Sequence, residues 1–260
     1  MSNFIALQIK EAVATITLNR PEVFNSFNRE MALALQDVLD QCEANDAVRT
    51  IVLTGSGKAF CAGQDLKEVT DPELNPGFRK ILEEHYNPII KRLRTIKKPV
   101  IGAVNGVAAG AGANIALACD IVVAHQKVSF IQAFSLIGLV PDSGGTYTLP
   151  RLIGFQKSMA LAMLGDKVSA EEAEAMGMIY KAVPLEEFES TISELAGKLS
   201  KMPTKALGMI KELFNASMSN SLEEQLAMES EYQIEAAQTE DYAEGVAAFI
   251  EKRQPNFKGQ

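Results

Sequence analysis

The feature that most limits how this chain can fold is a run of 20 residues, Val100–Cys119, that carries no charged side chain. A run of this length could cross a membrane as a helix. However, Asn105–Gly106 lies inside it together with several further glycines, and such residues favour turns. Asp120 follows directly. We therefore predict a buried strand, a tight turn and the start of a buried helix, and we expect no membrane span.

Short apolar segments and amphipathic segments alternate on both sides of this run. Strands are expected at residues 4–9, 13–18, 50–54, 99–104, 120–124 and 128–130. One helix is expected after Asn28 and another over residues 78–96, with a mobile loop at Asp71–Gly77 between them. This alternation predicts a layered α/β domain with crossover connections.

The later part of the sequence has a different character. Residues 155–254 are predicted to be almost entirely helical, and capping boxes are expected to start at Ser169 and Ser221. The helical tail, Thr204 to Arg253, has apolar faces that it cannot bury alone, so we expect it to pack on the core or on another subunit. We divide the chain into a core, residues 1–200, and a C-terminal helical region for oligomerisation, residues 201–260.

The composition excludes several classes of protein. The net charge is −8, so we expect no nucleic-acid partner, because such a partner needs a basic surface. The three cysteines show no CxxC spacing and the chain has two histidines, so we expect no metal site. Unpaired cysteines suit a reducing cytosol, and the N-terminal MSNFIALQIK shows no signal-peptide pattern, so we expect a cytoplasmic protein.

A turn of glycines and alanines, Asn105–Asn114, is predicted to join the uncharged strand to its helix. Small residues let a ligand approach the backbone closely. The first N–H groups of the helix are unpaired and could hold an anion or an oxyanion. The sequence is neither a P-loop nor a dinucleotide-binding G-x-G-x-x-G motif. Tight helix–strand packing would explain the small residues equally well.

A second candidate segment is Ala59–Leu66, which also follows a predicted strand and glycines. It could supply another backbone N–H, and two N–H groups that converge on one oxygen form an oxyanion hole. A nucleophilic Cys61 activated by His85 is a less favoured alternative, because cysteine is usually a small core residue.

The third candidate is Asp142, which lies between the apolar Leu139–Pro141 and the flexible Ser143–Gly145. An acid in apolar surroundings should have a raised pKa and could exchange protons near neutral pH. The same spacing fits a helix-capping or turn aspartate, and the residues alone leave both interpretations open.

Taken in this order and spacing, the three segments resemble the crotonase (enoyl-CoA hydratase/isomerase) superfamily. Further matches are Leu18–Pro21 near the start and Glu244–Arg253 near the end. The resemblance covers nearly the whole chain. It implies a crotonase-like α/β fold, in which stacked ββα units form a spiral core followed by a C-terminal helical region. It also implies a homotrimer or a dimer of trimers. The implied substrate is an acyl-CoA thioester, and no cofactor is expected because the CoA is part of the substrate.

The resemblance also implies a division of catalytic roles. The thioester oxygen would be held by the backbone N–H groups of Gln64 and Ala111. Hydratases of the family place glutamates where this chain has Asn114 and Phe134, and neither of these side chains can take a proton from water. Asp142 remains as a single proton shuttle, which implies an isomerase that moves a double bond or rearranges an epoxide next to the thioester.

Other site residues are implied by the same resemblance. Asn87, Asn114, Phe134, Leu139 and Tyr147 would line the acyl pocket, although asparagines near glycine and proline are more often turn formers. The CoA nucleotide would lie against residues 62–66, that is Ala62, Gln64, Asp65 and Leu66, with Phe24 and Asn25 nearby. Phe249 and Lys252 would reach the nucleotide of a neighbouring subunit, although Lys252 could equally be a solvated helix end.

Three other functions remain open from the sequence. The first is an enoyl-CoA hydratase (a lyase) that uses an unrecognised acid. The second is an acyl-CoA hydrolase or dehalogenase in which Asp142 attacks as a nucleophile. The third is a non-catalytic CoA-binding protein, which would bind CoA and turn over no thioester.

Overall fold

The computed structural model describes residues 3–260, and its strands form two sheets. The six-stranded sheet has the order β1 (Ile5–Lys10), β2 (Val13–Leu18), β3 (Thr50–Gly55), β5 (Val100–Val104), β7 (Ile121–His125) and β10 (Lys181–Val183). The four-stranded sheet has the order β4 (Ala59–Cys61), β6 (Val107–Ala109), β8 (Ser129–Ile131) and β9 (Lys167–Ser169). The β1–β2 and β8–β9 pairs are antiparallel and the other pairs are parallel.

Helices connect these strands and form the C-terminal region. The core helices are α1 (Arg29–Ala44), α2 (Leu66–Thr70), α3 (Phe78–Lys80), α4 (Asn87–Thr95), α5 (Ala111–Leu117), α6 (Gly145–Ile153), α7 (Phe155–Leu164), α8 (Ala170–Ala175) and α9 (Phe188–Leu199). The π-helical turn η2 (Ile81–Tyr86) joins α3 to α4, and η1 (Pro21–Val23), η3 (Ser135–Ile137) and η4 (Leu185–Glu187) are 3₁₀ turns. The last helices are α10 (Thr204–Ala216), α11 (Leu222–Ala236) and α12 (Glu240–Glu251).

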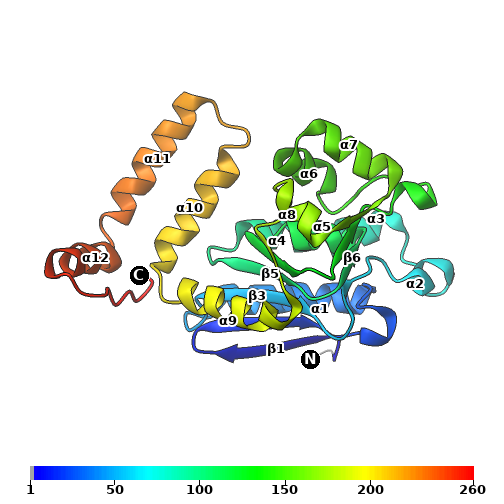
Figure 1. Cartoon of the computed structure of the whole chain (residues 1–260), viewed down its shortest axis with the longest axis horizontal. Coiled ribbons are helices and arrows are strands. Elements are labelled where there is room, and N and C mark those ends of the chain that lie inside the picture. Colours follow the sequence, from blue (N-terminus) through cyan, green and yellow to red (C-terminus); the bar gives the residue numbers. More distant parts are fainter. Residues whose placement is uncertain (1–2) are drawn as a thin grey trace.

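The large sheet has apolar cores on both of its faces. The larger core joins α1, α4 and α5 to the sheets, and the smaller one packs α9 against β3, β5 and β7. Figure 1 shows α10, α11 and α12 standing away from this layered body. An ion pair of 2.9 Å between the buried Lys211 on α10 and Asp120, whose side chain is 20% exposed, fastens this region to the core. No helix among the described residues is both long enough and apolar enough to cross a membrane.

The uncharged run folds as predicted, with one addition. It forms the strand β5, a turn at Asn105–Gly106 and the buried helix α5, but the turn leads first into the short strand β6, which the sequence did not predict. Gly112 has to be glycine because a Cβ atom there would lie 2.3 Å from the carbonyl oxygen of Cys61. The small residues therefore let α5 start directly against β4.

Two predictions about regular structure are corrected. Residues 155–254 are not almost entirely helical, because β9 and β10 lie among the helices. Each of these strands has three residues and pairs with a strand distant in sequence, so tertiary pairing overrides the weak local pattern. The predicted capping boxes at Ser169 and Ser221 are both confirmed.

The second correction concerns residues 78–96, which do not form one regular helix. The turn Ile81–Tyr86 is π-helical, and a π-turn inserts one extra residue and rotates the register of the helix after it. The neighbouring segments agree with the prediction, since residues 71–77 form a loop and Asn28 caps α1 through its side chain.

Candidate active site

A cavity of about 690 Å³ lies where α2, η2, η3 and the start of α5 meet. Most of its lining is apolar, and among the described lining residues Asp142 and Tyr86 are the ionisable ones. The lining residues are Val23, Ser26, Ala62, Gly63, Gln64, Leu66, Val69, Phe78, Ile81, Tyr86, Gly110, Ala111, Ala133, Phe134, Leu136, Ile137, Leu139 and Asp142. All three residues for which the sequence predicts a catalytic role therefore share one apolar chamber.

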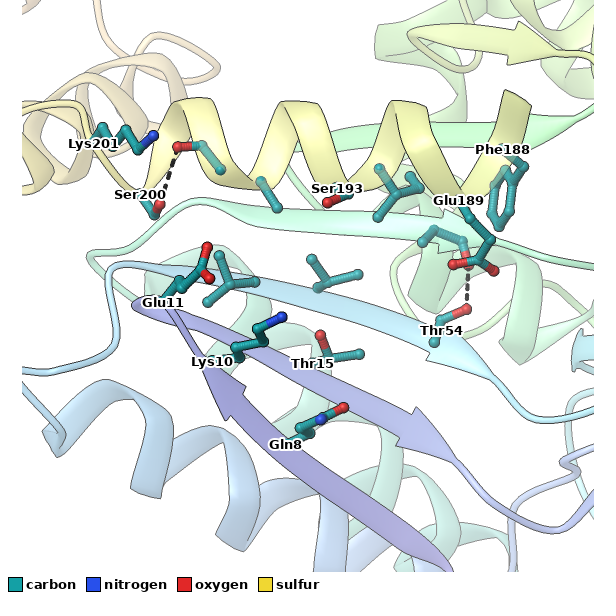
Figure 2. A pocket seen from close by; sticks show the side chains of 16 residues that line it. Gln8, Lys10, Glu11, Thr15, Thr54, Phe188, Glu189, Ser193, Ser200 and Lys201 are labelled. Carbon is teal, nitrogen blue, oxygen red and sulfur yellow. Dashed lines mark hydrogen bonds between the residues drawn. The ribbon is translucent and has the colours of Figure 1, made fainter. Parts of the chain in front are cut away.

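A second hollow, of about 310 Å³, lies between α9 and the strands β1, β2 and β3 (Figure 2). Figure 2 shows Lys10 and Thr15 on the strands, Glu11 in the turn between β1 and β2, and Ser193 and Glu189 on α9 around it. No residue that the sequence pointed to contributes to its described lining. The larger cavity is therefore the candidate active site.

The backbones of Gln64 and Ala111 meet at one edge of the small sheet. Gln64 follows β4 and Ala111 follows β6, and these strands are parallel neighbours. The carboxyl ends of adjacent parallel strands are where α/β proteins usually bind ligands. A Cβ atom placed on Gly63 would lie 3.6 Å from the Ala111 nitrogen, which shows how close the two loops approach.

The side chain of Gln64 is held by partners on both sides. The Tyr86 hydroxyl donates to Gln64 Oε1 at 2.8 Å, and Gln64 Nε2 donates to Glu68 Oε2 at 2.8 Å. The other carboxylate oxygen of Glu68 accepts from the backbone N–H of Arg29 at 2.7 Å. Burial raises the pKa of Tyr86 well above its usual value, so the hydroxyl stays protonated and remains a donor. The loop that carries the Gln64 N–H is thus fixed by hydrogen bonds.

Asp142 lies on the loop before α6 and is half-buried. Burial raises the pKa of its carboxyl group above the ordinary value. The Ser143 hydroxyl donates to Asp142 Oδ1 at 2.8 Å, and this hydrogen bond lowers the pKa by a smaller amount. A carboxyl group with a raised pKa in an apolar chamber can both accept and return a proton.

Comparisons with known proteins agree with this geometry. The family model described as enoyl-CoA hydratase/isomerase matches residues 8–260. The 1,2-epoxyphenylacetyl-CoA isomerase of Escherichia coli K12 is 47% identical over the full length of both chains. A probable enoyl-CoA hydratase of Rhodobacter capsulatus is 46% identical over 98% of each chain. The crystal structure of an enoyl-CoA hydratase from Bacillus anthracis superposes with a TM-score of 0.92, at 32% identity, over 99% of this chain and 100% of the other.

This chain belongs to the enoyl-CoA hydratase/isomerase family. It is therefore a crotonase-family enzyme that acts on acyl-CoA, and the crotonase-like α/β fold expected from its motifs is confirmed.

The structure brings only some of the expected pocket residues of this crotonase-family enzyme to the cavity. Phe134 and Leu139 line it, whereas Asn87, Asn114 and Tyr147 do not. Because of the π-turn, Tyr86 lines the cavity at this point and Asn87 is exposed to solvent. Tyr147 lies outside, half exposed, with the Arg151 guanidinium 3.7 Å from the centre of its ring.

The residues expected to hold CoA separate into two groups. Ala62 and Leu66 line the cavity, and Phe24 is exposed next to it, where its carbonyl accepts from Ala62 N. Asn25 and Asp65 have supporting roles instead. The buried Asn25 amide donates to the carbonyl oxygens of residues 56 and 59, and Asp65 caps α2 and forms an ion pair of 2.8 Å with Arg20.

The two C-terminal residues, Phe249 and Lys252, lie far from the cavity of their own chain. They belong to α12 and its C-cap, at the opposite end of the molecule from α2 and α3 (Figure 1). The side chain of Phe249 is 85% exposed. A contact between these residues and CoA can therefore arise only across subunits, and it stays a prediction.

The alternative with Cys61 as a nucleophile finds no support in the geometry. Burial raises the pKa of the Cys61 thiol to about 12, so the reactive thiolate is absent at neutral pH. The ring nitrogen Nε2 of His85 lies 3.0 Å from Nη1 of Arg29, and the backbone carbonyl of His85 accepts from the Gln36 side chain. These contacts of His85 do not involve Cys61.

The sequence did not point to four residues that the site of this crotonase-family enzyme uses. Tyr86 and Glu68 fix Gln64, and Ser143 and Gln132 support the loop of Asp142 directly or through Asn114. The stretch Gln64-Asp-Leu-Lys-Glu68 places Glu68 at helical spacing from Gln64, which was the one local signal that could have indicated this pair.

Proposed function

We propose that this enzyme is an acyl-CoA isomerase with Asp142 as its proton shuttle. The observation that carries the proposal is that Asp142 supplies the one carboxylate in the described lining of an apolar cavity that also receives the ends of β4 and β6. The relatives' names include both isomerase and hydratase, and the 47% identity to 1,2-epoxyphenylacetyl-CoA isomerase adds support for the first.

The proposed reaction has two proton transfers. The ionised Asp142 removes a proton from the acyl chain, and the electron pair left on carbon moves into the thioester to form an enolate. The backbone N–H groups of Gln64 and Ala111 stabilise the negative oxygen. Asp142 then returns the same proton to a different carbon, which moves the double bond. Protons and electrons balance, so the shuttle needs no cofactor besides the CoA that the substrate carries.

An epoxide substrate would undergo the same first steps. For an epoxide on the ring of phenylacetyl-CoA, Asp142 would take the proton from the CH₂ group next to the thioester. The C–C bond shared by the epoxide and the six-membered ring would break, both C–O bonds would remain in the resulting seven-membered ring, and Asp142 would return the proton to a ring carbon. The apolar wall that includes Phe134 and Leu139 would exclude water from these intermediates. We therefore propose 1,2-epoxyphenylacetyl-CoA or a 3-enoyl-CoA as the substrate.

Hydration is the main competing activity. It needs an acid and a base for water, and the two positions that carry glutamates in hydratases hold Asn114 and Phe134 here. The test is a panel of CoA thioesters given to the purified enzyme: 3-enoyl-CoA, 1,2-epoxyphenylacetyl-CoA and crotonyl-CoA. Isomerisation faster than hydration supports the proposal, and efficient hydration of crotonyl-CoA without isomerisation contradicts it.

We expect isomerase activity to fall at acidic pH. Asp142 must be ionised to remove a proton, and burial raises the pKa of its carboxyl, so kcat/KM should rise with pH through that raised value and then level off. The acid limb should therefore lie above the ordinary aspartate pKa of about 3.9. The measurement is kcat/KM from pH 4 to 9, with circular dichroism at each pH to exclude unfolding. A rate that is flat down to pH 4 would contradict the raised pKa.

We also propose assembly into a homotrimer or a dimer of trimers. The large apolar side chains exposed on α12 and α10 include Phe249, Ile250 and Phe214. Multi-angle light scattering should give a mass three or six times the 28.2 kDa of one chain. Replacing Phe249 with aspartate should lower that mass, because a charge would then be buried in the interface. A monomer for the unsubstituted protein would contradict the proposal.

A further inference from the structure

We propose that two buried amides, Asn114 and Gln132, form a positioning pair that holds the loop of Asp142 and so aims its carboxyl group into the cavity. The proposal rests on the proposed function for its kinetic test. It gives Asn114 a role other than contact with the substrate, and it adds a residue that the motifs did not point to.

The pair forms a continuous chain of hydrogen bonds. Gln132 Nε2 donates to Asn114 Oδ1 at 2.9 Å, and Asn114 Nδ2 donates to the backbone carbonyl oxygen of Asp142 at 2.8 Å. Each of the two amide side chains is 2% exposed. The chain links three segments distant in sequence, namely α5, the end of β8 and the loop before α6. It ends on the backbone of the proposed catalytic residue.

The loop that receives this chain has a backbone that needs support. Ser143 has a φ of 50° and Gly144 a φ of 74°, so two successive residues adopt the left-handed conformation. For a residue with a side chain this conformation persists only when surrounding contacts enforce it. The Asp142 carbonyl accepts from both Asn114 and Gly145 N, the latter at 2.8 Å, so both of its lone pairs are occupied.

Close packing adds to the hydrogen bonds. A Cβ atom on Gly145 would lie 2.4 Å from Asn114 Nδ2, so the loop is in direct contact with the amide. The carboxyl group of Asp142 is attached to the same residue whose carbonyl is held, and Ser143 donates to its Oδ1. Fixing the carbonyl therefore limits the directions in which the carboxyl group can point.

Gln132 has a feature that separates positioning from stability. Its Oε1 atom is buried without a hydrogen-bond partner among the described residues. A change of Gln132 to methionine removes this unsatisfied acceptor but leaves Asn114 Oδ1 without its donor, so the number of unsatisfied buried acceptors stays the same and the fold should lose little stability. The loss of the donor leaves Asn114 free to turn its amide, and the Asp142 loop then loses its orientation.

The experiment compares the variants Asn114→Ala, Gln132→Met and their combination. Because a misplacement of about 1 Å can lower a rate about 100-fold, we expect kcat to fall between about 10-fold and 100-fold in each single variant, with KM nearly unchanged. If Gln132 acts only through Asn114, the double variant should be no slower than Asn114→Ala. The control is Asn215→Ala, which removes an amide that also donates to a backbone carbonyl at 2.8 Å, that of Arg94, far from the cavity.

A second readout monitors the carboxyl group itself. In Asn114→Ala the loop should admit water around Asp142, so the acid limb of kcat/KM should move to lower pH. Tyr86, the other ionisable group in the described lining, stays protonated over this range and does not disturb the measurement. A merely structural role for Asn114 would lower the melting temperature and leave the pH profile in place.

The outcomes separate this proposal from the proposed function. Multiplicative losses in the double variant, or unchanged pH profiles in the single variants, would overturn the positioning pair while isomerase activity stands. If the unsubstituted enzyme shows no isomerisation, the proposed function fails. In that case the pKa of Asp142 is measured by ¹³C NMR, with the signal assigned by comparison with Asp142→Asn. A lower pKa in Asn114→Ala than in the unsubstituted enzyme supports the positioning pair, and an equal pKa overturns it.

Discussion

Replacing Asp142 with asparagine should lower kcat for isomerisation between about 100-fold and 10,000-fold, which is the range that general acid–base catalysis contributes. Asparagine has the same shape and keeps an oxygen that can accept from Ser143, so KM should change little. No other carboxyl group lies in the described lining of the cavity to replace the lost base. Single-turnover kinetics with 3-enoyl-CoA or 1,2-epoxyphenylacetyl-CoA measure the change.

The matched control for this prediction is Asp166→Asn, since Asp166 is an exposed aspartate outside the cavity. Turnover of Asp142→Asn within a few-fold of the unsubstituted enzyme would show that the proton moves through another group. Mass spectrometry of the unsubstituted enzyme during turnover checks the alternative in which Asp142 is a nucleophile. A covalent adduct on this aspartate would favour a hydrolase or dehalogenase over the shuttle.

Replacing Lys211 with methionine should reduce the free energy of unfolding by about 1–3 kcal/mol, because the partly buried Asp120 carboxylate loses its charged partner. The Lys211 side chain is 7% exposed and that of Asp120 is 20% exposed, so the carboxylate would stay partly buried without its cation. The Asp120 carboxylate would keep only its bond from the backbone N–H of Val100, at 2.8 Å. Urea denaturation monitored by circular dichroism measures the change.

The control lies on the same helix. Lys205 on α10 forms an exposed ion pair of 3.2 Å with Glu235, and the loss of such a surface pair costs between about 0 and 1 kcal/mol. Lys205→Met and Lys211→Met should therefore differ clearly in their urea midpoints. Equal midpoints would mean that the Lys211–Asp120 pair does not fasten the C-terminal helices to the core.

The sequence predicted the layers and the cavity residues that depend on local patterns. Val100–Cys119 had to be buried because it lacks charge, and its glycines marked the turn that leads to α5. The predicted oxyanion residues, Gln64 and Ala111, reach one cavity because each directly follows a short strand of the same sheet. Asp142 could be singled out because its neighbours are apolar on one side and small on the other.

The remaining parts of the site depend on contacts between distant residues. The amide of Asn114 meets a carbonyl 28 positions further along the chain, and no local pattern indicates that partner. Tyr86 replaces Asn87 in the wall because of a single inserted residue in a helix, and hydrophobic spacing does not reveal such an insertion. β9 and β10 were missed because strands of three residues are defined by their neighbours.

The contact between Asn114 and Gly145 restricts how this enzyme could change its chemistry during evolution. A glutamate at position 114, as in hydratases, would be longer than the amide that already touches the loop, and its oxygens would meet the carbonyl of Asp142. Glutamates at positions 114 and 134 would therefore not fit this structure without a shift of the loop. Residues 142–145 would have to change together with position 114, which couples the conformation of this loop to the residue type on α5.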